Sequence, residues 1–235
     1  MTMLSIVQSA QLRLGLNKSS TVAGNIDDTT VQLLALLNQA GEEMAEVYTW
    51  QALTKEATFT TVATESQGSV STVAPGFAYI LNQTIWNRSL RRPIFGALNA
   101  EEWQLLKASS VQGPFQQYRI RGDELLLIPA PPAGQSCAFE YMTKNWCTDS
   151  TGAVGKSAFT ADTDVALLDE QMLTLSLVWR FKQAQALDFS TELQMYENRL
   201  TNMMARDGGK PVLDMNGRVQ VLMPGVMVPQ GSWPL

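Results

Sequence analysis

The residues best placed to do chemistry form a near match to the phosphate-binding loop of nucleotide-binding proteins. Residues 150–157 read STGAVGKS, whereas the pattern GxxxxGK[ST] requires glycine where Ser150 stands. Such a loop also needs a helix N-terminus behind it, because the amides there bind the phosphates. The residues that follow, AFTADTD, do not begin a helix. The sequence therefore favours a flexible polar loop over a nucleotide site.

Pairs of acidic residues are the second feature that suggests chemistry, since two carboxylates can act as acid and base on a sugar. Each pair lies on the polar side or in the first turn of an expected helix, where acids are soluble and interact favourably with the helix dipole. A solvated helix face is therefore a better interpretation than an active site. The pairs are Glu42 with Glu46, Glu101 with Glu102, and Asp169 with Glu170.

The chain of 235 residues has no histidine, which removes the commonest general base and the commonest metal ligand. Its two cysteines, Cys137 and Cys147, are too few for a zinc site without histidine. If the segment between them is one straight strand, they lie roughly 30 Å apart, too far for a disulfide. We therefore expect free thiols, a reducing compartment and no metal or other cofactor.

The only dense basic cluster consists of Arg88, Arg91 and Arg92, next to Trp86. Such a cluster binds phosphate or the acidic face of a neighbour, and an exposed strand end explains it equally well. The net charge of −5 argues against a protein that grips nucleic acid by neutralising phosphates. Neither a leader pattern nor an apolar run of about 18 residues is found, so we expect no membrane partner.

The strongest helical pattern covers residues 167–187, which carry two apolar stripes and should be covered on more than one side. A second helix follows, with Asp188 or Ser190 as its N-cap and Gly208 in its stop, so the two should form an antiparallel hairpin. Near the N-terminus, helices are expected over residues 3–15 and 27–50. Within the latter, Gly41 either lets another helix approach closely or is an ordinary helical glycine. The first apolar stripe of residues 167–187 consists of Leu168, Met172, Leu175 and Trp179. The second consists of Leu173, Leu177, Phe181 and Ala184.

The middle of the chain has the composition of strands rather than helices, from Lys55 onwards. Residues 118–131 predict a hairpin with a two-residue turn at Gly122-Asp123, and residues 137–147 predict one further strand. Residues 77–87 fit a strand or a short helix equally well. Two further features are an edge position for Pro93 and a short helix that Asn99 and Glu102 cap with a capping box.

Residues 211–235 are too apolar for a disordered linker, yet glycine and proline interrupt them every few residues. We interpret them as an extended arm that adds a strand to the sheet edge of a partner. Folding back onto the chain's own β region is the alternative. The candidate partner-binding residues of the arm are Val219, Val221, Met223, Met227 and Trp233.

The predicted fold class is therefore α+β. It consists of an antiparallel helical bundle from residues 1–52 and 160–210, an inserted β-rich domain of residues 53–150, and an extended C-terminal arm of residues 211–235.

Five stretches of the sequence resemble head-to-tail adaptor proteins of tailed bacteriophages, also called connector or head-completion proteins. They are WQALTKEATFTT, IWNRSLRRPIFGALNAEEWQLLKA, YRIRGDELLLIPAP, FEYMTKNW and ARDGGKP. The resemblance implies a ring, commonly of twelve subunits, that sits between the portal protein and the tail or nozzle protein. It also implies a C-terminal segment that contacts the portal.

On this resemblance, we expect a structural protein of the virion neck that is assembled in the host cytoplasm and is not an enzyme. Genomic DNA would pass through the ring without specific binding, because an acidic lumen repels the phosphates. Arg88, Arg91 and Arg92 would bind the portal or a neighbouring subunit. The alternative function is a tail-associated peptidoglycan hydrolase that uses the glutamate pairs.

Overall fold

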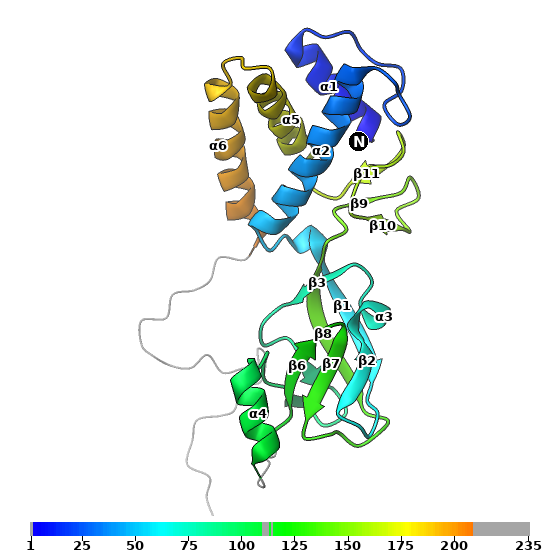
Figure 1. The fold of residues 1–235 in the computed structure, drawn as a ribbon, viewed down its shortest axis with the longest axis vertical. Helices are drawn as coiled ribbons and strands as arrows, with labels where there is room; N and C mark the ends of the chain where they lie inside the picture. The colour runs from blue at the N-terminus through cyan, green and yellow to red at the C-terminus, as the bar shows by residue number, and fades with distance from the viewer. Residues whose placement is uncertain (1, 110–112, 114, 209–235) are drawn as a thin grey trace, which may run out of the picture.

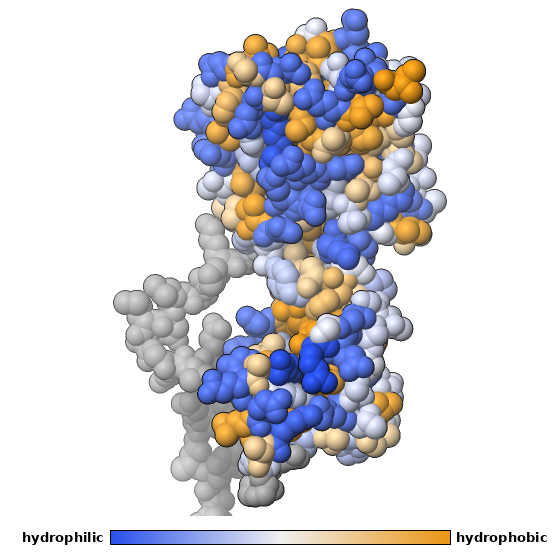
Figure 2. Space-filling model, in the orientation of Figure 1, coloured by the Kyte–Doolittle hydropathy of each residue, from blue (hydrophilic) through white to orange (hydrophobic). Residues whose placement is uncertain are grey.

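The computed structural model describes residues 2–109, 113 and 115–208, which form an α+β structure of α-helices and antiparallel sheets. Four long helices lie at one end of an elongated molecule, and most strands lie at the other (Figure 1). A narrower waist separates the two ends (Figure 2). Among the described helices, none combines the length and apolar character needed to cross a bilayer.

The helical part contains α1 (Met3–Leu14), α2 (Asp28–Val47), α5 (Glu170–Ala184) and α6 (Ser190–Asp207). Capping side chains fix where these helices begin, as they satisfy amides that have no partner within the helix. Asp27 accepts from the amide of Thr30 over 3.0 Å, and Gly15 ends α1 in the left-handed region, with φ 70°. The predictions of helices over residues 3–15 and from Asp27 are therefore confirmed.

Helix α5 is the centre of the helical part, because it packs against α1, α2 and α6. Both predicted apolar stripes are buried along most of their length, but Ala184 is exposed at the last turn. The helix is shorter than the predicted 167–187, since Asp169 caps it by accepting from the amide of Met172 over 2.8 Å. The short α5–α6 connection confirms the predicted hairpin (Figure 1).

The main core of the helical part draws residues from both ends of the chain and from the waist. Apolar residues of α1, α2 and α5 meet Leu53, Trp146 and Phe159 in one buried cluster. Trp146 packs against α2 at Gly41, where an added Cβ would overlap its ring. Gly41 therefore admits a close neighbour, but that neighbour is a tryptophan from the segment between β8 and β9, not the helix that was expected. The helical members include Met3, Ile6, Val7, Ala10, Leu33, Leu37, Met44, Met172, Leu173 and Leu177.

Two antiparallel sheets form the β part and enclose a second core. The first sheet has the order β1 (Thr54–Thr60), β8 (Ser136–Thr143), β4 (Trp86–Asn87) and β5 (Arg92–Pro93), and β3 (Phe77–Ile80) also pairs with β8. Pro93 thus lies on a terminal strand as predicted, and residues 77–87 contain strands. The inward side chains are Ala57, Phe59, Cys137, Phe139 and Tyr141.

The second sheet has the order β2 (Ser66–Ser69), β7 (Glu124–Ile128) and β6 (Gln117–Arg121). Strands β6 and β7 join through the two-residue turn, which confirms the predicted hairpin. Helix α4 (Ala100–Ala108) covers the outer face of this sheet through Trp103, and its capping box is confirmed. A single turn α3 (Val70–Val73) and a 3₁₀ turn η1 (Gln51–Leu53) were not predicted.

Two predictions about the segment after β8 are wrong. Strand β8 ends at Thr143, and Cys147 begins β9 (Cys147–Thr148) in a different sheet, because burial of Trp146 in the helical core turns the chain. The polar segment that contains residues 150–157 is not a flexible loop, since it includes β10 (Gly155–Lys156), which pairs with β9. Strand β11 (Val165–Ala166) completes this small sheet. Both cysteines are free and buried, Cys137 in the β core and Cys147 in the helical core.

We predict that Gly41→Ala lowers the stability of the protein, because the new methyl group overlaps the buried Trp146 ring. Overpacking of this kind costs about 1–3 kcal/mol and opposes the gain of about 1 kcal/mol from alanine in a helix. Gly113→Ala is the control, since no described residue lies within 4 Å of its added Cβ. Urea unfolding of the two variants gives the comparison, and an unchanged or higher midpoint for Gly41→Ala contradicts the packing argument.

We also predict that neither thiol reacts in the folded protein at pH 8. Burial raises the pKa of Cys137 to about 11 and that of Cys147 to about 12, so almost no thiolate is present. A chromogenic disulfide reagent should therefore label both thiols only after denaturation. Rapid labelling of either cysteine under native conditions is the contrary result.

Candidate functional site

Arg88 and Arg91 of the predicted arginine cluster lie in the connection between β4 and β5, and Arg92 begins β5. Arg88 and Arg91 line a shallow groove of about 570 Å³ on the outer face of the first sheet. Arg92 lines a separate hollow, with Leu90 and Phe115. The turn is held by Asn87, whose side-chain oxygen accepts from the amide of Leu90 over 3.0 Å. Arg91 completes the turn with φ 55°.

Acidic residues on neighbouring strands face the arginines of this groove. Glu56 on β1 lies directly opposite Glu140 on β8 in the strand register, and both are exposed. Arg88 forms an ion pair with Glu56, whereas the Glu140 carboxylate has no hydrogen bond or ion pair with the described residues. Two like charges directly opposite each other destabilise a sheet slightly. Since Arg88 pairs with Glu56, the charge of Glu140 is the one that the described residues leave uncompensated. The groove is therefore a surface for charged side chains rather than an enclosed reaction site.

The sequence analysis missed Glu56 and Glu140 as members of this surface. Glu140 stands between the inward-facing Phe139 and Tyr141 on β8. Since successive side chains of a strand face opposite sides of the sheet, this alternation places Glu140 on the outer face. The same argument places Glu56 beside the inward-facing Ala57. The alternation was visible in the sequence, but the pairing of β1 with β8 was not.

Two of the three carboxylate pairs contribute a helix cap, and the third pair is exposed. Glu102 completes the capping box of α4, accepting from the amide of Asn99 over 2.9 Å. Asp169 caps α5 and accepts two hydrogen bonds of 2.8 Å from Arg199, which hold the pKa of its carboxyl below the usual value. Glu42 and Glu46 are exposed on α2, near the waist. None of the three pairs lies in an enclosed site from which water is excluded.

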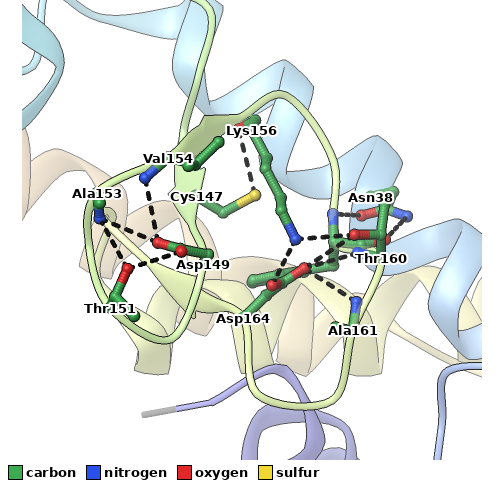
Figure 3. A network of polar contacts seen from close by, with 11 residues as sticks. Asn38, Cys147, Asp149, Thr151, Ala153, Val154, Lys156, Thr160, Ala161 and Asp164 are labelled. Carbon is green, nitrogen blue, oxygen red and sulfur yellow. Dashed lines mark hydrogen bonds and ion pairs between the residues drawn. The ribbon is translucent and has the colours of Figure 1, made fainter.

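The near match to the phosphate-binding loop is part of a polar network rather than a phosphate cradle (Figure 3). Lys156, the lysine of the motif, lies on β10 and forms an ion pair of 2.7 Å with the buried Asp164. Asp164 also accepts from the amides of Thr160 and Ala161, over 2.8 and 2.9 Å. Burial alone would raise the pKa of Asp164, but these donors outweigh it and lower the pKa. The lysine is thus committed to a structural role.

The same segment is bound to both N-terminal helices. Asn38 of α2 exchanges side-chain hydrogen bonds with the backbone of Phe159, and the amide of Met3 donates to the Asp164 carbonyl over 2.8 Å. Asp162 accepts from the amides of Val22 and Ala23. These bonds fix residues 155–164 against α1 and α2. Among the described residues, no group of three or more acidic, cysteine or histidine side chains is arranged to hold a metal ion.

The remaining predicted site residues, Val219, Val221, Met223, Met227 and Trp233, lie outside the described residues. The last described helix, α6, ends at the waist of the molecule. There Asp207 accepts a hydrogen bond of 2.7 Å from the amide of Gln51. The described chain therefore ends beside the junction of the helical part and the β part.

Comparison with known proteins identifies a protein family. No curated protein matches the sequence. The profile of a family described as SU10 adaptor protein matches residues 1–220, which is nearly the whole chain. This match agrees with the resemblance to head-to-tail adaptors noted from the sequence. The chain therefore belongs to the SU10 adaptor protein family.

Proposed function

We propose that this protein forms a ring in the neck of a tailed bacteriophage, between the portal and the tail or nozzle protein. The observation that carries the proposal is the family match over residues 1–220, since the family name denotes a structural adaptor. In this role the ring continues the DNA channel and provides the platform for tail attachment. Twelve subunits are proposed, assembled in the host cytoplasm and carried in the virion.

An adaptor ring needs surfaces that bind proteins and a lumen that does not hold DNA. The net charge of −5 suits a channel through which DNA slides, because phosphates are repelled rather than neutralised. The proposal includes no enzymatic activity. It is supported by the roles of Glu102 and Asp169 as helix caps and by the commitment of Lys156 to Asp164.

We further propose that the two buried cores correspond to two domains, an antiparallel helical bundle and a β-rich domain inserted into it. The helical core collects residues from both ends of the chain, and the β core collects residues from 57 to 141. Trp146 and Cys147 pack in the helical core. Leu53 also packs in the helical core, so the proposed β-rich domain begins at β1 rather than at residue 53, and its packing ends near Thr143 rather than at residue 150.

The C-terminal arm, residues 211–235, is proposed to bind the portal. The chain leaves the described structure beside the waist, where Asp207 binds Gln51. A fully extended chain of the length of residues 209–235 spans at most about 90 Å, enough to reach another protein. In a ring every copy binds at once, so that individually weak arms give a firm attachment.

Deleting residues 211–235 tests the role of the arm. We expect the truncated protein to keep its thermal midpoint, because residues 2–208 by themselves supply two buried cores. It should form rings in isolation but no longer remain bound to a portal ring. Native mass spectrometry with and without the portal measures both effects. Unfolding of the truncated protein, or undiminished portal binding by it, contradicts the proposed role.

Incubation with purified peptidoglycan tests the absence of enzymatic activity. We expect no release of reducing sugar above that of a boiled sample. Turnover by the intact protein that is lost in Glu42→Gln or Glu101→Gln would instead support the hydrolase.

A further inference from the structure

The β part presents charged side chains on two opposite faces. Glu56 and Glu140 alternate along β1 and β8 with residues of the β core, so they point out of the first sheet. Arg119 and Arg121 alternate along β6 with Tyr118 and Ile120, which pack on the same core from the other sheet. Since the core lies between the sheets, the two sets face away from each other.

Several of these charges have no partner among the described residues. On the first face, Arg88 compensates Glu56, and Glu140 and Arg91 are left without ion pairs. On the opposite face, Arg121 and its register partner Glu124 are exposed and likewise form no ion pair within the described chain. Each face therefore offers one uncompensated carboxylate and at least one uncompensated guanidinium.

Apolar features accompany the charges on both faces. The apolar part of the groove on the first face is formed by Trp86 on β4 and by its register partner Ala138 on β8. On the opposite face, α4 covers the sheet through Trp103 and leaves Leu105 70% exposed. A partly buried tryptophan beside a small residue and an exposed leucine are the kinds of side chain that form the centre of an interface.

We propose that the occupant of the groove is a second copy of this chain, whose β6–α4 face packs against the β8 face of its neighbour. In this contact Glu140 pairs with Arg121 of the next copy, and Arg91 pairs with Glu124. A head-to-tail contact between opposite faces generates a closed ring when its rotation closes. The inference deepens the proposed function, on which it rests, by identifying the surfaces that join the subunits.

The complementary charges favour this occupant over nucleic acid. The groove holds two carboxylates beside its arginines, and carboxylates repel phosphates. Conversely, pairing of opposite charges in two places fixes the register of a protein contact and rejects other partners. The chain itself supplies the matching face, so no further partner is required.

Charge reversal tests the contact. Glu140→Arg places two cations opposite each other across the interface, so the ring should dissociate to the 25.9 kDa subunit. We expect the concentration for half-assembly to rise about tenfold or more, since like charges at an interface are strongly unfavourable. Arg121→Glu should have the same effect. The double variant Glu140→Arg/Arg121→Glu should assemble as the natural protein does, because it restores the pair with its signs exchanged.

Stability of the single subunit separates this effect from misfolding. Glu140 lies opposite Glu56, so its replacement by arginine removes a like-charge pair and should not lower the thermal midpoint. If Glu140→Arg nevertheless fails to fold, Arg121→Gln at the exposed end of the β6–β7 hairpin gives the same test, because it removes the cation without placing a second carboxylate opposite Glu124. Glu197→Arg, on the exposed face of α6, is the control for the change in net charge.

Mass photometry at matched concentrations distinguishes the outcomes. Loss of the ring in both single variants with recovery in the double variant supports the inference. An intact ring in Glu140→Arg, or equal loss in Glu197→Arg, overturns the inference and leaves the proposed ring in place. Absence of a ring in the natural protein, alone and with a portal, overturns the proposed function as well.

Discussion

The contact between Trp146 and Gly41 is the constraint on which the rest of the structure depends. The chain leaves the helical part after α2 and returns after β8, and Trp146 is the residue that anchors the return. Its ring lies against the helix where only a glycine leaves room. Because the ring is fully buried, β8 must end before it, and the next residues pair as the small β9–β10–β11 sheet. Burial of one aromatic residue thus determines where the β part stops.

The helices and the strongest hairpin could be predicted from the sequence because their signals are local. Asp27, Asp169 and the Asn99–Glu102 capping box each satisfy amides within one turn of themselves. The turn at Gly122-Asp123 likewise needs only its own residues. Assignments of this kind hold when local preference and packing agree.

Features that depend on distant partners could not be predicted in the same way. The break between β8 and β9 follows from Trp146 meeting a helix more than a hundred residues earlier in the chain. The order in residues 148–163 depends on Asn38 and on Asp164, which is buried beside Lys156. For the arginine cluster, composition identified Arg88, Arg91 and Arg92, but only the pairing of β1 with β8 brings Glu56 and Glu140 to two of them.

The hydrogen bond between Asp207 and Gln51 gives the molecule a mechanical property. It ties the end of α6 to the segment between α2 and β1, through which the chain passes from the helical part to the β part. Tension applied at the end of α6 would therefore act at the waist between the two parts, where the lever arm is short. An attachment at the end of α6 would transmit force between the two parts but produce little torque on them. The helical and β parts could then retain their relative orientation while the molecule is under load.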